Sequence, residues 1–266
     1  MKDRPIGVFD SGVGGLTVVK QLMKEMPNED IVYFGDTARV PYGTKSASTI
    51  RKFSIENVLF LLNFDVKLVI IACNTSSAIC LPFLGKYFSV PIIGVIKPGA
   101  KAAARSTGNA RIGVIGTRAT IASGAYEDEV RSINPRARVF SRSCPLFVPL
   151  AEEGWANDGI AGAVAKKYLS GLKRTGIDTV ILGCTHYPLL RKAISGALGK
   201  GVELVDSAEE TAKEAKELLE KCGMKNRGKK AGSAKFYVSD APEKFLEVAR
   251  KFLGREVKKA EQVKDV

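Results

Sequence analysis

Two short apolar runs, each ending in a cysteine, constrain the fold of this chain more than any other feature. They are residues 68–73 (LVIIAC) and 179–184 (TVILGC), and both are rich in β-branched residues. Runs of this kind, flanked by helical patterns, are typical of strands buried on both faces of a parallel sheet. Open α/β sheets bind their ligands at the carboxyl ends of the strands. We therefore expect Cys73 and Cys184 to lie at a ligand site.

The two runs belong to a longer internal repeat. Residues 6–9 (IGVF) precede Cys73, and residues 112–115 (IGVI) precede Cys184, by about 70 residues in each case. A period of this size predicts two duplicated α/β halves rather than a solenoid, and two such halves facing each other would place the cysteines across one cleft. Short apolar runs are also common enough to resemble one another by chance.

Between the predicted strands lie amphipathic helical patterns, so the chain alternates strand and helix. The predicted strands cover residues 5–9, 31–34, 68–72, 92–94, 111–115, 138–140, 179–182, 203–205 and 235–238. We predict a crossover between the halves at residues 95–99, an exposed loop at 223–232 and a frayed tail at 258–266. The fold class is α/β with parallel sheets.

Composition narrows the function classes. The chain has 266 residues, 45% of them hydrophobic and 26% charged, as in an ordinary globular protein. No apolar run is long enough to span a membrane, and the first residues lead into a strand without a secretory segment. The five cysteines are dispersed and contain no C-x-x-C pair, which favours neither disulfides nor a zinc site. We expect a cytoplasmic protein with reduced thiols and no bound metal.

The net charge of +13 is compatible with a nucleic-acid partner. The excess lies more in the middle of the chain, between residues 97 and 142, where nine Lys and Arg residues are opposed by only three acidic residues. No aromatic-interleaved patch or RNA-binding signature accompanies these cations, and they could equally attract small anions. A basic, nucleic-acid-associated regulatory protein therefore stays open as an alternative of a different class.

A glycine-rich turn, residues 10–15 (DSGVGG), follows the first predicted strand. It resembles a dinucleotide fingerprint only superficially, because Thr17 occupies the third glycine position and no acidic residue follows at the required distance. We therefore exclude NAD. The turn places Asp10 and Ser11 at a strand end, where nearby amides could hold an anion. Asp10 could equally cap the next helix.

Both cysteines are suited to acid/base chemistry. A thiol is a competent acid, and its thiolate a competent base, when the pKa lies near the working pH. Each precedes a predicted helix, beginning near Ser76 and Tyr187, whose dipole would favour the thiolate. Small polar residues follow each thiol, and one of them is His186, the only histidine of the chain. The other cysteines, Cys80, Cys144 and Cys222, receive no role.

Two acid/base groups on opposite sides of a cleft, without a cofactor motif, are suited to inverting the configuration of a carbon atom that carries an acidic proton. One thiolate would remove the α-proton from one face while the other thiol protonates the opposite face. No Walker loop, metal cluster or recognisable cofactor site is found in the sequence, so we expect no cofactor.

Five segments resemble the bacterial glutamate racemases, within the cofactor-independent Asp/Glu racemase family. They are residues 7–15, 33–43, 71–75, 145–150 and 182–188, and the resemblance covers nearly the whole chain with the motifs in order. It implies two flavodoxin-like domains related by a pseudo-twofold axis, with the site in the cleft between them. The implied domains are residues 1–95 plus 207–266, and residues 96–206.

The resemblance also implies the activity, which is racemisation of L-glutamate to D-glutamate for peptidoglycan. It implies a homodimer that needs no nucleic acid and no membrane. Cys73 and Cys184 would be the bases for the D- and L-enantiomers, with Asp10 supporting Cys73, and His186 and Glu152 at the second site. The implied substrate-binding residues are Asp10, Ser11, Pro41, Tyr42, Gly43, Asn74, Thr75, Thr117, Thr120, Thr185 and His186.

The chemistry of these residues agrees with a dicarboxylate substrate. Carboxylates favour hydroxyl, amide and backbone N–H donors. Lysine and arginine are scarce in the motifs, so we expect backbone dipoles to carry much of the carbanion stabilisation. Aspartate stays open as the alternative substrate, because a single methylene is distinguished by pocket depth. Relatives acting on hydantoins or malonates are less favoured, since the decarboxylating ones keep only one of the two cysteines.

Overall fold

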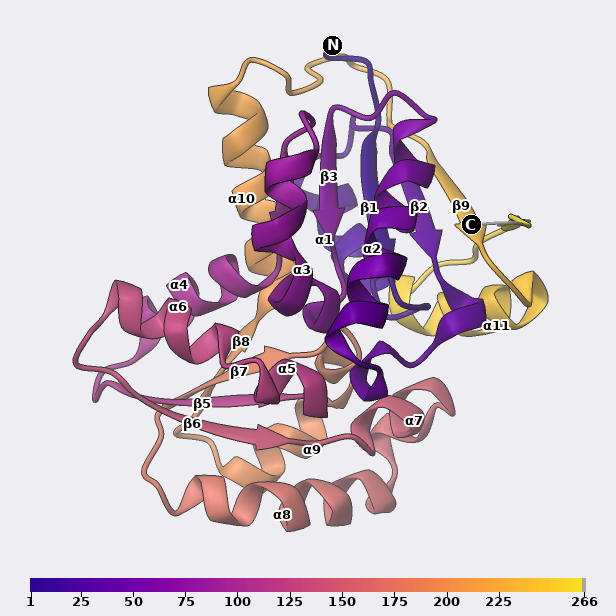
Figure 1. The fold of residues 1–266 in the computed structure, drawn as a ribbon. Helices are drawn as coiled ribbons and strands as arrows, with labels where there is room; N and C mark the ends of the chain where they lie inside the picture. Colours follow the sequence, from indigo (N-terminus) through magenta and orange to yellow (C-terminus); the bar gives the residue numbers. More distant parts are fainter. Residues whose placement is uncertain (265–266) are drawn as a thin grey trace.

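The computed structural model describes residues 1–264, which form two parallel sheets linked by helices (Figure 1). The first sheet has the strand order β10-β9-β2-β1-β3-β4 and the second has the order β6-β5-β7-β8. The strands of the first are β1 (Ile6–Asp10), β2 (Ile31–Gly35), β3 (Leu68–Ile71), β4 (Ile92–Gly94), β9 (Ala234–Val238) and β10 (Glu261–Gln262). Those of the second are β5 (Arg111–Gly116), β6 (Arg138–Ser143), β7 (Thr179–Gly183) and β8 (Glu203–Asp206). The predicted α/β class with parallel sheets is confirmed.

The internal repeat is visible in the strand order. The neighbours β2-β1-β3-β4 of the first sheet correspond to β6-β5-β7-β8 of the second. Ile6 pairs with Ile31 and Leu68, and Ile112 occupies the same central position in its own sheet. This is the flavodoxin-like order 2-1-3-4, in which ligands bind where the first and third strands diverge.

Helices cover both faces of each sheet and bear the site loops at their ends (Figure 1). The α-helices are α1 (Leu16–Glu25), α2 (Ala47–Leu62), α3 (Asn74–Tyr87), α4 (Ile96–Ser106), α5 (Arg118–Ala122), α6 (Ala125–Ile133), α7 (Phe147–Glu152), α8 (Gly159–Lys173), α9 (Arg191–Leu198), α10 (Ser207–Lys221) and α11 (Pro242–Leu253). Four 3-10 turns are η1 (Thr37–Arg39), η2 (Tyr42–Thr44), η3 (Trp155–Asn157) and η4 (Tyr187–Leu190).

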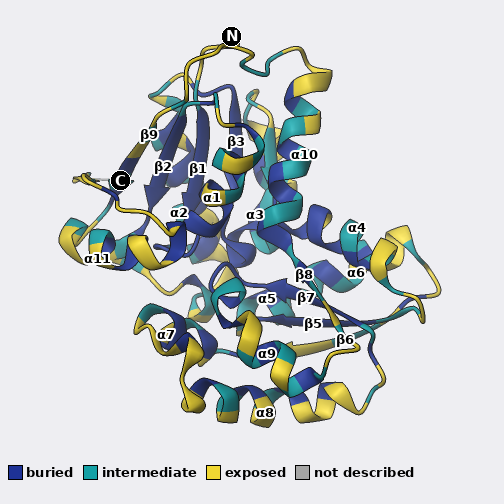
Figure 2. Cartoon of the chain, turned by 180° about the vertical axis from the view of Figure 1, so that it is seen from behind, coloured by how far each residue is buried: buried dark blue, intermediate teal, exposed yellow. Residues whose placement is uncertain are grey.

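Alternation of side chains across each strand fills two cores per sheet. Ile6 and Val8 of β1 pack into the core that α1, α10 and α11 cover, whereas Phe9 packs into the core under α2 and α3. In the second sheet, Ile115 and Val114 of β5 divide in the same way between two cores. Because both faces are covered, the central strands β1, β2, β3 and β7 are buried throughout, whereas the edge strands β6 and β10 and the outer helix faces carry exposed residues (Figure 2). The continuous apolar runs in the sequence reflect this double burial.

The predicted crossover at residues 95–99 lies where the chain leaves β4 of the first sheet for β5 of the second, and helix α4 begins there, at Ile96. One local prediction needs correction. The segment predicted as a frayed tail contains strand β10, which pairs with the end of β9; residues 265–266 of that prediction lie outside the described residues. Most of 223–232 has no regular structure, as predicted. The division into residues 1–95 plus 207–266 and residues 96–206 stays a prediction.

Candidate active site between the two sheets

The two cysteines occupy equivalent places beside the switch points of their sheets. Cys73 follows β3 and Cys184 follows β7, and each of these strands pairs with the first strand of its half. The turn after β1 supplies Asp10 and Ser11, and the turn after β5 supplies Thr117. The strand topology therefore places the carboxyl ends of four strands, each followed by polar residues, at one cleft.

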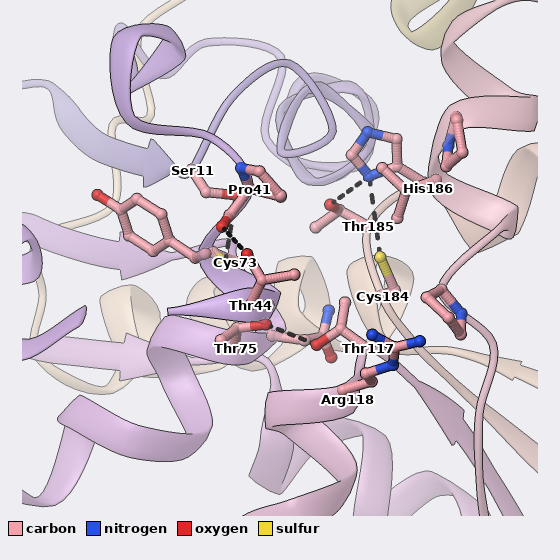
Figure 3. Close-up of a pocket in the computed structure, with 16 residues that line it drawn as sticks. Ser11, Pro41, Thr44, Cys73, Thr75, Thr117, Arg118, Cys184, Thr185 and His186 are labelled. Carbon is pink, nitrogen blue, oxygen red and sulfur yellow. Dashed lines mark hydrogen bonds between the residues drawn. The ribbon is translucent and has the colours of Figure 1, made fainter. Parts of the chain in front are cut away.

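A single cavity of about 160 Å³ connects these strand ends (Figure 3). Its lining consists of Ser11, Pro41, Tyr42, Gly43, Thr44, Cys73, Asn74, Thr75, Thr117, Arg118, Pro145, Val148, Pro149, Cys184, Thr185 and His186. Both thiols thus border the same cavity, as the repeat predicts. Of the predicted site residues, Asp10, Thr120 and Glu152 are not in the lining and lie behind it.

Cys73 is positioned by the amino end of helix α3, immediately before Asn74. Its Sγ lies 3.6 Å from Oγ of Ser11, and its side chain is almost fully buried. Burial, together with the neighbouring Asp10 carboxylate, raises the pKa of the Cys73 thiol to about 12. At neutral pH the resting form of Cys73 is therefore the protonated thiol.

Asp10 does not cap helix α1, which begins after Gly15 without a side-chain cap. Its Oδ2 accepts a hydrogen bond from the Gly12 amide at 3.0 Å, while its buried Oδ1 has no partner among the described residues. Burial raises the pKa of Asp10, and the nearby imidazole of His186 offsets part of that effect. Behind the Cys73 thiol, Asp10 thus provides a carboxyl group with one unused oxygen.

Cys184 has a different environment, formed by His186 and Glu152. Its Sγ lies 3.8 Å from Nδ1 of His186, and Nε2 of His186 lies 2.8 Å from Oε1 of Glu152. Burial alone would lower the pKa of His186, but the hydrogen bonds to Cys184 and Glu152 outweigh it and raise the pKa to about 10. The imidazole of His186 thus connects the Cys184 thiol to the Glu152 carboxylate and is placed to exchange a proton with either.

The predicted helix dipole at Cys184 is absent. The residues after it form the short turn η4, and helix α9 begins only at Arg191. At Cys73 the dipole is present, because α3 begins at the next residue. The two thiols are therefore assisted differently, one by a helix end and the other by a cationic histidine.

Three threonine hydroxyls join the two halves at the floor of the cavity. Oγ1 of Thr75 lies 2.9 Å from Oγ1 of Thr117 and 3.1 Å from Oγ1 of Thr120. Beside them, Asn74 accepts a hydrogen bond from Tyr126, and its buried Nδ2 has no partner among the described residues. An amide donor without a partner, beside hydroxyls that hydrogen-bond to one another, is suited to a carboxylate ligand.

The sequence did not predict five lining residues, Thr44, Arg118, Pro145, Val148 and Pro149. Arg118 corrects the expectation that cations are scarce, since its guanidinium side chain borders the cavity beside Thr117 (Figure 3). Its position directly after a predicted site threonine was the signal that could have identified it. The two prolines and Val148 add apolar side chains to the lining of the cavity.

The raised pKa of His186 makes the stability of the fold depend on pH. The folded protein holds this proton more tightly than the unfolded chain, so the stabilisation is fully present below pH about 6.5 and is lost as the pH rises to about 10. In a Glu152→Gln variant one group that holds the imidazolium is removed. We expect the difference in melting temperature between wild type and this variant to shrink between pH 6.5 and 10. A constant difference across that range would contradict the linkage.

The two repeated α/β halves share one cavity, which lies at the switch points of both sheets. One thiol from each half borders this cavity, and the arrangement defines a two-lobed enzyme. The chain belongs to the Asp/Glu/Hydantoin racemase family, whose model matches residues 10–215, and it is an enzyme of the isomerase class. A glutamate racemase from Geobacter metallireducens is 51% identical over 94% of this chain and 93% of its own length.

Solved structures agree over nearly the full chain. A glutamate racemase isoform from Bacillus anthracis has a TM-score of 0.96 at 38% identity, covering 99% of this chain and 98% of its own. The glutamate racemase from Francisella tularensis, in complex with D-glutamate, has a TM-score of 0.93 at 44% identity with the same coverage. An aspartate racemase from Picrophilus torridus shares the fold alone, with 17% identity and a TM-score of 0.58.

In the part of the chain that the structure describes, no three His, Cys, Asp or Glu side chains are grouped closely enough to hold a metal ion. No helix within residues 1–264 has the length and apolar character needed to cross a bilayer.

Proposed function

We propose that this protein interconverts L- and D-glutamate without a cofactor, using Cys73 and Cys184 as the two acid/base groups. The observation that carries the proposal is the placement of both thiols on one cavity, at matching strand ends of a repeated fold. Near-full-length relatives named glutamate racemase favour glutamate as the substrate.

In the L-to-D direction the thiolate of Cys184 takes the α-proton and becomes a thiol. The C–H electron pair stays on the α-carbon as a carbanion, and the Cys73 thiol then gives its proton to the opposite face and becomes a thiolate. The resting environment of Cys73 suits this direction, since burial keeps its thiol protonated, while Nδ1 of His186 lies 3.8 Å from Sγ of Cys184. The D-to-L direction uses the reverse protonation states.

After each turnover the two thiols must exchange protons to restore the starting form. The chain from Cys184 through His186 to Glu152 offers a route, because the Glu152 side chain is 40% exposed whereas His186 is buried. We propose that Glu152 and His186 relay this proton to solvent. Asp10, whose carboxylate interacts with Cys73 and has one unused oxygen, would assist Cys73 from within the protein, because it is buried.

The α-proton of an amino acid is far less acidic than a thiol, so the site must stabilise the carbanion strongly. The amino end of α3 points its free amides at the cavity beside Cys73, where charge develops on the α-carboxylate. The hydroxyls of Ser11, Thr75, Thr117 and Thr185 supply further donors around the two carboxylates of the substrate.

Several wider proposals rest on family membership alone. The D-glutamate would be used for peptidoglycan, and the enzyme would work in the cytoplasm as a homodimer without nucleic acid. Residues 1–95 with 207–266 and residues 96–206 would form the two domains that enclose the site.

Proton NMR of L-glutamate in D2O tests the activity directly. We expect the α-proton signal to disappear without added cofactor, and chiral analysis to show D-glutamate. L-aspartate under the same conditions tests the alternative substrate. Exchange with aspartate and not with glutamate would reassign the substrate, and an unchanged spectrum with both would overturn the proposal.

A further inference from the structure

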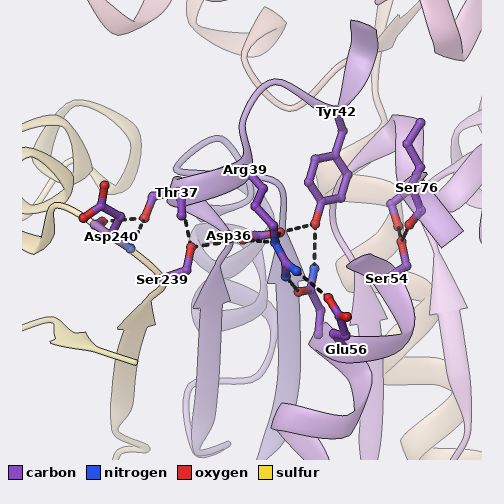
Figure 4. Close-up of polar contacts among 12 residues, drawn as sticks. Asp36, Thr37, Arg39, Tyr42, Ser54, Glu56, Ser76, Ser239 and Asp240 are labelled. Carbon is purple, nitrogen blue, oxygen red and sulfur yellow. Dashed lines mark hydrogen bonds and ion pairs between the residues drawn. The ribbon is translucent and has the colours of Figure 1, made fainter. Parts of the chain in front are cut away.

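A buried carboxylate, Asp36, lies behind the loop that forms one side of the cavity (Figure 4). It follows β2 and is fully buried. The Arg39 guanidinium donates to it from Nε, at 2.8 Å to Oδ1 and 2.6 Å to Oδ2, and Ser239 Oγ donates at 3.0 Å. The Tyr42 hydroxyl donates a further short hydrogen bond to Oδ2. Every residue in this set lies outside the cavity lining except Tyr42.

Arg39 is fixed from several directions. Besides Asp36, its guanidinium pairs with Glu56 and donates to Oδ1 of Asn57 at 3.1 Å, both on helix α2. It also lies over the ring of Phe53, 4.2 Å from the centroid. A planar guanidinium held by several acceptors and a ring face is rigid, and a lysine ammonium cannot reproduce this geometry.

Tyr42 connects the network to the cavity. Its hydroxyl donates to Asp36 and accepts from Nδ2 of Asn57 at 3.1 Å, so the hydroxyl points away from the substrate space. Tyr42 therefore offers the substrate its ring and backbone, and not its hydroxyl. The next residue, Gly43, faces the other half of the protein, where an added Cβ would lie 2.8 Å from Cβ of Thr117.

We propose that Asp36 and Arg39 are substrate-positioning residues that act through Tyr42. They fix the backbone of residues 42–44, and this sets the width of the cavity between Gly43 and Thr117. The inference rests on the proposed function, because it assigns this loop to the binding of glutamate. It names residues that touch neither the cavity nor the thiols.

The expected signature is a change in KM with little change in kcat. The network holds a binding wall, whereas Cys73 and Cys184 are positioned by other elements, α3 and β7. A displaced binding wall weakens the binding of the substrate and of the transition state alike, which raises KM and leaves kcat nearly unchanged. We expect KM for both enantiomers to rise about 10- to 100-fold in Asp36→Asn, while kcat changes by less than about threefold.

A second buried ion pair provides a matched control. Lys67 Nζ lies 2.5 Å from Oε2 of Glu29, and both side chains are 1% exposed. This pair adjoins the amino ends of β2 and β3, at the edge of the sheet opposite the cavity. Glu29→Gln, like Asp36→Asn, breaks a buried ion pair, so both variants are expected to lower the melting temperature. Only Asp36→Asn should raise KM.

The experiment measures steady-state kinetics in both directions, with melting temperatures, for Asp36→Asn, Arg39→Lys, Tyr42→Phe and Glu29→Gln. Arg39→Lys keeps the charge and should give an intermediate KM. Tyr42→Phe removes the hydroxyl that connects the network to the cavity. The double variant with Asp36→Asn and Tyr42→Phe should therefore have the same KM as Tyr42→Phe alone. If Asp36→Asn does not fold, the Tyr42→Phe and Arg39→Lys values decide the question in the same way.

Unchanged KM in all three network variants, or an equal rise in Glu29→Gln, would overturn the inference while wild-type racemisation stands. A wild-type protein inert toward glutamate would instead overturn the proposed function, and the positioning role with it.

Discussion

Replacement of Cys73 or Cys184 by alanine is expected to lower glutamate racemisation by at least ~10³-fold while the protein stays folded. A positioned acid/base group typically contributes about 10²- to 10⁴-fold, and no other side chain in the cavity replaces a thiol on its face. Cys144→Ala is the matched control, because Cys144 is also buried and follows a strand of the second sheet but does not line the cavity. Its racemisation rate should stay near that of wild type.

Each single variant should keep half of the reaction. In D2O, the Cys184 thiolate of Cys73→Ala would remove the α-proton of L-glutamate and return a deuteron to the same face. We expect slow exchange into L-glutamate without D-glutamate, and the mirror result for Cys184→Ala with D-glutamate. Wild-type racemisation in either variant would contradict the two-thiol mechanism.

Gly14→Ala is expected to reduce kcat by at least ~10²-fold, because it pushes the two halves of the site apart. A Cβ on Gly14 would lie 2.3 Å from Oγ1 of Thr185 and 2.5 Å from Cε1 of His186. Thr185 and His186 are held closely by their own strand and by Glu152, so the new methyl group must displace them.

Gly85→Ala in helix α3 is the control for this substitution. Nothing lies within 4 Å of its added Cβ, so we expect unchanged kcat and a gain in stability of about 0.5–1 kcal/mol, measured by denaturant unfolding. Wild-type kcat in Gly14→Ala would mean that the glycine-rich turn does not bear on His186 during catalysis.

Much of the fold was predictable because burial on both faces leaves a strong pattern. All nine strands predicted from apolar runs are present, with ends that shift by a few residues. The edge strand β10 escaped because Glu261 and Gln262 are exposed and pair along one side only, so their side chains carry no apolar signal. The helix after Cys184 was predicted too early because a 3-10 turn and an α-helix share the same apolar spacing over one turn.

The residues of the site also differ in whether the sequence could predict them. Strand-end motifs identified the two cysteines, Asp10 and Ser11 from local pattern, but Thr117 and Glu152 were found by resemblance alone. The contact of Glu152 with His186 spans 34 residues of sequence and leaves no local trace. The direction of the Tyr42 hydroxyl depends on Asp36 and Asn57 together, which only the folded chain brings into contact. Local sequence predicts which residues lie at a strand end, whereas contacts between residues far apart in the sequence are known only from the folded structure.

The segment from β9 to α11 supports both sides of the site although it carries neither cysteine. Ser239 holds Asp36, the ring of Phe252 packs edge-on against His186 at 5.3 Å, and Lys251 donates to the Glu152 carbonyl at 3.0 Å. During synthesis these residues leave the ribosome long after both thiols. A nascent chain ending before β9 would hold both cysteines and still lack the groups that position them. Catalytic competence should therefore appear late in translation, when the returning segment closes the first sheet.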